Sequence, residues 1–131
     1  MCDCKVLIID DEKILCDLFS MALQRAGYKV YQATTAQDAL KLMAETPCQI
    51  IFMDINLPDM DGLDLARKLR QGEPLLQINA ITGNLPWLEE RMAEDSPFVD
   101  LLGKPLEIKD LLTAAAASWA RLKKLGVAGG G

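Results

Sequence analysis

Short apolar runs alternate with longer segments of helical spacing along the chain, and this alternation repeats five times. The short runs have the length of strands. Their mostly continuous apolar character is typical of strands that are buried on both faces of a parallel sheet. The pattern predicts strands at residues 5–10, 28–33, 49–54, 77–82 and 98–102.

After each run, apolar residues recur at the three- and four-residue spacing of amphipathic helices. This spacing predicts helices at residues 12–26, 36–45 and 62–71, a short helix with Pro86 in its first turn, and a last helix at residues 107–122. Local signals at the helix ends agree with the pattern. Thr35 and Asp61 are suitable N-caps, Gly27 is a suitable C-terminal glycine, and Pro47 ends a helix.

Strands that alternate with helices of this length predict an α/β fold: a doubly wound, five-stranded parallel sheet with helices on both faces. In such folds ligands bind outside the carboxyl ends of the strands. Polar residues at the strand ends are therefore the first candidates for function. We expect one domain over residues 1–123, followed by a tail over residues 124–131 whose glycine-rich composition favours flexibility.

Four of the five predicted strands end in or beside a polar residue. Asp10 and Asp11 follow the first strand, and Asp54 ends the third. Thr82 ends the fourth strand, and Lys104 follows the fifth. Taken singly, each residue has an ordinary structural explanation as a cap, a turn former or a solvated loop residue. Together, at one edge of a parallel sheet, they indicate a site.

The chemistry of such a site follows from its charges. Three carboxylates at one sheet edge repel each other, so ionising all of them is costly without a compensating positive charge. A divalent cation with oxygen ligands supplies that charge, and Mg²⁺ suits the site because it accepts both carboxylate and phosphate oxygens. A carboxylate nucleophile beside Mg²⁺, a lysine and a hydroxyl has the groups that phosphoryl transfer requires.

The composition excludes several other classes of function. The 131 residues include no histidine, which rules out Ser-His-Asp and Cys-His catalysis and His-ligated zinc. A net charge of −5 disfavours direct binding to nucleic acid or to anionic membranes. Cys16 and Cys48 fit small core positions, and the Cys2–Cys4 pair lacks a second pair at metal-site spacing. The absence of a membrane span and of a secretory signal predicts a cytoplasmic location.

The strand-end motifs resemble those of the receiver domain of two-component response regulators, similar to the chemotaxis receiver. The resemblance extends over residues 5–122 and rests on four segments in order. These are Val6–Glu12 (VLIIDDE), Met53–Gly62 (MDINLPDMDG), Thr82 at a strand end, and Gly103–Pro105 (GKP). It implies a flavodoxin-like sheet with the strand order 2-1-3-4-5.

The resemblance also implies a role for each site residue. Asp54 would be the phosphorylated residue. Asp10, Asp11 and Asp54 would hold Mg²⁺, together with the backbone carbonyl of Asn56. The cofactor that the resemblance implies is therefore Mg²⁺ alone.

Two further residues would contact the phosphoryl group. Thr82 would donate its hydroxyl to one phosphoryl oxygen, and Lys104 would pair with another. Pro105, after a cis peptide bond, would orient this lysine. The family usually has Tyr or Phe three residues before the lysine, as a switch that moves with the threonine. Here the residue at that position is Leu101.

The resemblance implies a phospho-acceptor in a phosphorelay. Such a domain takes its phosphoryl group from a histidine kinase or a phosphotransfer protein and then switches a partner or an output domain. The fourth helix, fifth strand and fifth helix are the candidate face for that partner. The domain promotes its own phosphorylation and dephosphorylation but is not counted as an enzyme. The alternative is a receiver-like docking module that works without phosphorylation, which Leu101 favours and the complete acidic set disfavours.

Two other interpretations fit less well. A small phosphatase with an Asp-x-Asp motif would need a second aspartate where Asn56 stands. A calcium loop at Asp59–Gly62 would lack its first acidic ligand and its closing glutamate, and Pro58 breaks the required spacing.

Overall fold

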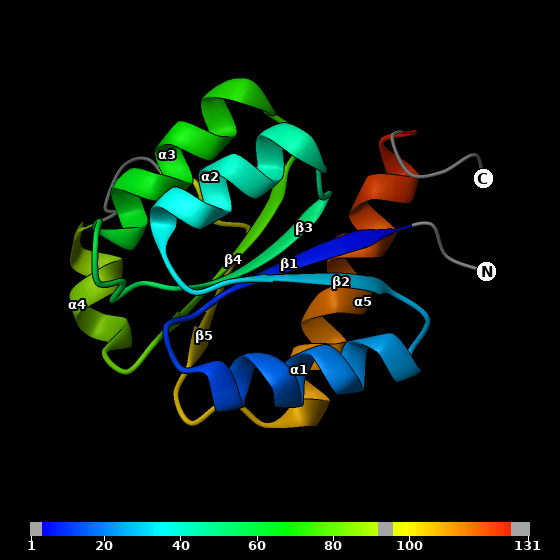
Figure 1. Ribbon diagram of the computed structural model, residues 1–131, viewed down its shortest axis with the longest axis horizontal. Coiled ribbons are helices and arrows are strands. Elements are labelled where there is room, and N and C mark those ends of the chain that lie inside the picture. The colour runs from blue at the N-terminus through cyan, green and yellow to red at the C-terminus, as the bar shows by residue number, and fades with distance from the viewer. Residues whose placement is uncertain (1–3, 92–95, 127–131) are drawn as a thin grey trace.

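The structure, a computed structural model, describes residues 4–91 and 96–126, in which strands and helices alternate strictly (Figure 1). The strands are β1 (Lys5–Ile9), β2 (Lys29–Ala33), β3 (Ile50–Asp54), β4 (Gln77–Thr82) and β5 (Asp100–Gly103). The helices are α1 (Lys13–Arg25), α2 (Ala36–Glu45), α3 (Gly62–Gly72), α4 (Leu85–Arg91) and α5 (Ile108–Lys124).

The five strands form one parallel sheet in the order β2-β1-β3-β4-β5. The predicted α/β class, the parallel sheet and the strand order are confirmed. Because all strands run in the same direction, their carboxyl ends lie along one edge. β1 and β3 are neighbours, with Ile9 beside Met53, and β4 pairs with β5, with Thr82 beside Gly103.

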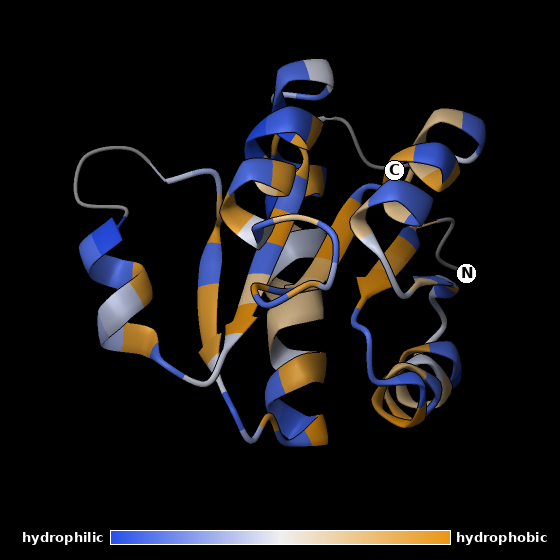
Figure 2. Ribbon diagram, turned by 60° about the vertical axis from the view of Figure 1, so that its left-hand side comes forward, coloured by the Kyte–Doolittle hydropathy of each residue, from blue (hydrophilic) through white to orange (hydrophobic). Residues whose placement is uncertain are grey.

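Helices cover both faces of the sheet, with α2 and α3 on one side and α1 and α5 on the other (Figure 1). The buried strand β3 shows why its sequence is apolar throughout. Ile51 and Met53 belong to the core beneath α2 and α3, whereas Ile50 and Phe52 belong to the core beneath α1 and α5. Figure 2 shows apolar residues gathered on the strands and on the inner sides of the helices.

The predicted helix-end signals are present. The Thr35 side chain accepts a hydrogen bond from the Asp38 backbone N–H at 3.1 Å, at the start of α2. The Asp61 carboxylate accepts one from the Leu63 backbone N–H at 2.8 Å, at the start of α3. Gly27, after α1, has a φ of 101°, a backbone conformation that glycine adopts without steric cost.

A buried polar contact joins α5 to the middle of the sheet. Asn79 of β4 is fully buried and donates its amide N–H groups to the Ser118 hydroxyl of α5 at 3.2 Å and to the Ile51 carbonyl at 3.3 Å. At the next turn of α5, the Arg121 guanidinium donates to the Gln77 side chain at 3.2 Å. Apolar packing is thus supplemented by two polar contacts along one helix face.

Two boundaries differ from the prediction by two residues, and several others differ by one. β5 begins at Asp100, because the Phe98 N–H is bonded to the Ser96 hydroxyl in a local turn at 3.1 Å and does not enter the ladder. α5 continues to Lys124, two residues beyond its predicted end at residue 122. The short fourth helix begins at Leu85, so Pro86 lies in its first turn, as predicted. Residues 127–131 of the predicted tail lie outside the described residues.

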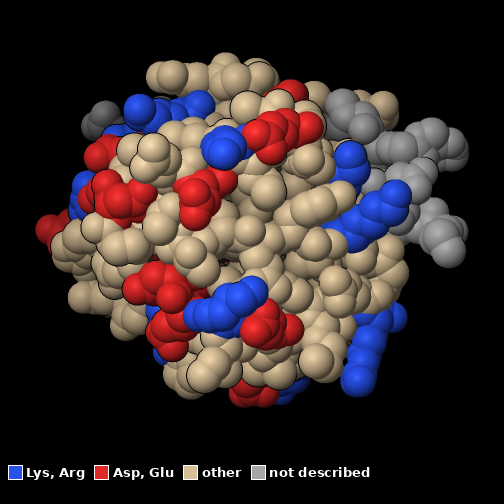
Figure 3. All heavy atoms as spheres, in the orientation of Figure 1, with Lys and Arg blue, Asp and Glu red and all other residues tan. Residues whose placement is uncertain are grey.

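Cys16 and Cys48 are buried, as predicted, and Cys4 is buried as well; Cys2 lies outside the described residues. Within residues 4–91 and 96–126, none of the helices has the length and apolarity to cross a membrane. On the face shown in Figure 3, lysine and arginine side chains are scattered among acidic ones and do not form a continuous basic patch.

Candidate functional site

Three aspartates meet at the carboxyl edge of the sheet. Asp54 is the last residue of β3, and Asp10 and Asp11 directly follow β1, its neighbour. Carboxylate oxygens of the three residues lie within 4.8 Å of one another. Asp10 and Asp54 are buried, whereas Asp11 is exposed. The sequence predicted this convergence correctly, because parallel strands bring their carboxyl ends to one edge.

Lys104 adds a positive charge beside the three aspartates. Its ammonium lies 2.7 Å from Asp54 Oδ2 and forms an ion pair with it. The Lys104 backbone N–H donates to the Thr82 carbonyl at 2.8 Å, and the Lys104–Pro105 peptide bond is cis. Burial disfavours the charged ammonium, but the hydrogen bond and charge of Asp54 outweigh it, so the pKa of Lys104 is raised.

Asp10 has one carboxylate oxygen bonded and one without a partner. Oδ1 accepts the Glu12 backbone N–H at 2.9 Å. Oδ2 is buried and has no hydrogen-bond partner among the described residues. Burial raises the pKa of Asp10 to about 6, and the nearby charge of Asp54 adds to this effect. A buried carboxylate oxygen without a partner, on one of three clustered aspartates, is a suitable ligand for a hard cation, so the residues present fit Mg²⁺.

Asp54 is held by a second contact besides Lys104. Its Oδ1 accepts the Asn56 backbone N–H at 2.9 Å. Asn56 in turn forms an antiparallel bridge with Asp61, and the Gly62 N–H donates to the Ile55 carbonyl at 2.9 Å. The loop that follows the predicted acceptor is therefore closed at its base, which fixes the direction of the Asp54 side chain.

Thr82 ends β4 beside this group and is buried. Its hydroxyl oxygen accepts the Asn84 backbone N–H at 3.0 Å. The Asn84 side chain accepts the Trp87 backbone N–H at 3.1 Å, so Asn84 caps α4. Leu101, in β5, is half-buried and packs against the core beneath α2 and α3.

Sequence reasoning missed two roles in the loop after β3. Asp59 accepts hydrogen bonds from the backbone N–H groups of Ala36 and Gln37 at 2.8 and 3.0 Å and so caps α2 from a distant loop. Asp61 also binds the guanidinium of Arg91 at 2.7 Å. In each contact the partner lies more than twenty residues away in sequence, so no local sequence signal indicates it.

The Arg91 side chain connects this loop to α4. Its guanidinium carbon lies 4.8 Å from the centre of the Trp87 ring, a distance typical of a cation–π contact. Burial raises the pKa of Asp61, but the bonds from Arg91 and from the Leu63 N–H outweigh this effect and lower it overall. The loop is thus in contact with α2, α3 and α4.

A family model described as the response regulator receiver domain matches residues 6–116. The chain belongs to this family. The receiver domain is 31% identical, over 109 residues, to the alkaline phosphatase synthesis transcriptional regulatory protein PhoP of Bacillus subtilis (strain 168). The alignment covers 83% of the present chain and 41% of PhoP, so the receiver domain spans less than half of that relative.

Solved structures agree with this assignment. The receiver domain resembles a response regulator receiver domain protein (CheY-like) from Methanospirillum hungatei JF-1, with a TM-score of 0.87 and 25% identity over 94% of this chain and 98% of that one. It also resembles a two-component response regulator from Clostridium difficile, with a TM-score of 0.83 and 26% identity over 92% and 98% of the two chains.

Proposed function

We propose that this receiver domain is a phospho-acceptor whose acceptor residue is Asp54. The observation that supports this most directly is the environment of Asp54. A buried carboxylate lies within reach of two other carboxylates, is paired with Lys104 at 2.7 Å, and is positioned by the Asn56 N–H. A turn or capping aspartate has no need of a partly buried lysine and two further aspartates.

The chemistry is a transfer between a phosphohistidine and a carboxylate. An Asp54 carboxylate oxygen attacks phosphorus, and the bond from phosphorus to the donor nitrogen breaks with its electron pair leaving on that nitrogen. The product is an acyl phosphate on Asp54. The Lys104 ammonium, which already donates to Asp54, then donates to a phosphoryl oxygen, and the Thr82 hydroxyl donates to another.

Asp10 Oδ2, Asp11, Asp54 and the carbonyl of Asn56 would hold Mg²⁺. When bound, the ion neutralises charge on the three carboxylates and on the phosphoryl oxygens. The partners are a histidine kinase or phosphotransfer protein as donor, and an output domain or protein that docks on the face of α4, β5 and α5. The greater length of PhoP supports a linked output domain in that relative.

The test is labelling with acetyl phosphate and Mg²⁺, measured by intact mass. We expect one phosphoryl group on the wild-type domain and none on Asp54→Asn. Asp64→Asn, at an exposed position on α3, is the matched control and should label normally. Failure of the wild-type domain to accept phosphate would refute the proposal, and full labelling of Asp54→Asn would place the acceptor elsewhere.

A further inference from the structure

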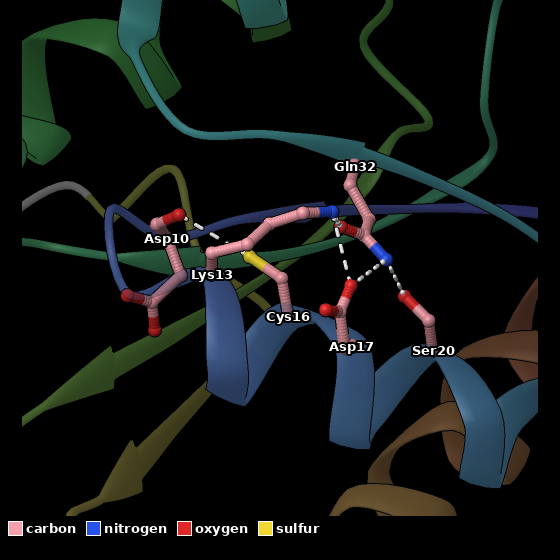
Figure 4. A network of polar contacts seen from close by, with 6 residues as sticks. All are labelled: Asp10, Lys13, Cys16, Asp17, Ser20 and Gln32. Atoms are coloured by element: carbon pink, nitrogen blue, oxygen red, sulfur yellow. Dashed lines mark hydrogen bonds and ion pairs between the residues drawn. The ribbon is translucent and has the colours of Figure 1, made fainter.

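Three groups of Asp10 form hydrogen bonds: its backbone N–H, its backbone carbonyl and one carboxylate oxygen. The Asp10 N–H donates to the Ala33 carbonyl of β2 at 3.1 Å, and Oδ1 accepts the Glu12 N–H. The Asp10 carbonyl accepts a hydrogen bond from the Cys16 thiol of α1 at 3.2 Å (Figure 4). Of the Asp10 oxygens, Oδ2 is the one without a hydrogen-bond partner among the described residues.

Cys16 is suited to act as a donor. It is fully buried, on the face of α1 that packs against the sheet. Its Sγ lies 3.2 Å from the Asp10 carbonyl oxygen, so the thiol is the donor in this contact. Protonated thiols are weak but real hydrogen-bond donors.

The position of the thiol is fixed because α1 is itself bonded to β2. Figure 4 shows the Gln32 side chain of β2 reaching the polar face of α1. It accepts from the Lys13 ammonium and donates to the Asp17 carboxylate at 3.2 Å and to the Ser20 hydroxyl at 2.8 Å. These three α1 residues lie on one side of the helix, so a single glutamine holds its first two turns against the sheet.

We propose that Cys16 is a positioning residue for Asp10, holding its backbone so that Oδ2 stays turned toward the cation site. The proposal rests on the function proposed above, because it concerns affinity for Mg²⁺. Bonds to the residues that support metal ligands orient those ligands and affect metal affinity. Without the thiol donor, the Asp10 carbonyl is free and its peptide can rotate. Mg²⁺ binding must then order this peptide, and the cost in conformational entropy lowers the affinity for Mg²⁺.

The test is the Mg²⁺ affinity of the full chain, measured by titration calorimetry for three variants. Cys16→Val keeps the volume of the side chain but removes the donor. We expect its Mg²⁺ affinity to fall by about three- to tenfold, the equivalent of one hydrogen bond. Cys16→Ser keeps a donor in place and should retain an affinity close to that of the wild type.

The chain provides a matched control in Cys48. This thiol is also buried, with its pKa raised by burial to about 11, and it donates to the Thr46 carbonyl at 3.4 Å, at the opposite end of β3 from Asp54. Cys48→Val should leave Mg²⁺ affinity unchanged. Thermal melting without metal records the structural cost of each substitution separately from binding.

The outcomes separate the two proposals. Equal Mg²⁺ affinity in Cys16→Val and in the wild type would overturn the positioning role while leaving the phospho-acceptor function standing. An equal loss in Cys16→Ser and Cys16→Val would also overturn it, since the donor would then not matter. A wild-type chain that binds no Mg²⁺ and accepts no phosphate would overturn both.

Discussion

The loops that follow β3 and β4 leave the sheet side by side at the site, but they are held very differently. The loop at residues 55–61 is closed at its base, caps α2 and α3 with two carboxylates, and is linked to α4 by Arg91. The loop at residues 83–84 is held by the Thr82 hydroxyl and the Asn84 cap. Apart from the two neighbouring residues in the chain, none of the described atoms lies within 4 Å of a Cβ built on Gly83.

The two loops are therefore suited to different roles, one to holding Asp54 and the other to movement. The first loop holds Asp54, the proposed acceptor, in a fixed direction through Asn56 and has little freedom to change. The second loop has room to rearrange, and it joins Thr82 directly to the start of α4. If Asp54 is phosphorylated as proposed, a movement of the Thr82 hydroxyl away from the Asn84 N–H would alter the support of α4 first.

Alanine substitutions at Gly62, which follows the first loop as the first residue of α3, and at Gly83 in the second loop should give the largest contrast. A Cβ on Gly62 would lie 2.7 Å from Ile55 Cα and 2.8 Å from its carbonyl oxygen. Because both are backbone atoms, we expect Gly62→Ala to lower the free energy of unfolding by about 3 kcal/mol. Gly83→Ala should be neutral or stabilising by about 0.5 kcal/mol, since it restricts the unfolded chain. Urea denaturation measures both, and similar values would remove the distinction between the loops.

Removing the cap of α4 should have a smaller effect. Asn84→Ala leaves the Trp87 N–H without its partner, and we expect a loss of about 1 kcal/mol in the free energy of unfolding. Asn84→Ser, which retains a capping oxygen, should lose less. If both variants matched the wild type, α4 would not depend on the second loop, and the proposed path from Thr82 to α4 would fail.

The contact between the first loop and α4 should be weaker still. The Arg91–Asp61 pair is partly exposed, with about a third of each side chain accessible, and exposed pairs of this kind contribute about 0.5 kcal/mol. We expect Arg91→Gln to lower stability by that amount, and less at high salt, because salt screens the pair. An unchanged effect at high salt would assign the loss to packing on Trp87 instead.

Acid should weaken the first loop and not the second. The bonds from the Ala36 and Gln37 N–H groups hold the pKa of Asp59 below its usual value of 3.8. Its stabilising contribution is therefore present above about pH 4 and declines as the pH falls through the lowered pKa. We expect Asp59→Asn to cost stability at pH 6 and less at pH 3. Asn84→Ala, which removes no titratable group, should cost the same at both.

Most of the fold was predictable because its signals are local. Continuous apolar runs mark strands buried on both faces, and the caps at Thr35 and Asp61 were visible in sequence. The gathering of Asp10, Asp54 and Lys104 followed from one rule of parallel sheets. The Phe98 boundary was wrong because an apolar residue beside a strand looks like part of it, whereas the Ser96 hydroxyl holds it in a turn.

Long-range side-chain contacts were not predictable. Asp59 caps α2 from a loop, and the thiol of Cys16 donates to Asp10 across a helix–strand junction. Neither residue type nor spacing indicates such a partner, because the contact depends on how whole elements pack. The sequence therefore located the charged groups of the site but did not show what holds them.

The Asn79–Ser118 contact has a consequence for anything joined to the end of α5. A helix that rests on a sheet through apolar contacts alone can slide or turn at little cost. Displacing Ser118 by one turn would remove an acceptor from a fully buried amide, at a cost of about 1–3 kcal/mol. The contact thus fixes the position of α5 along the sheet, so the C-terminal end of this helix lies at a set height and points in a set direction.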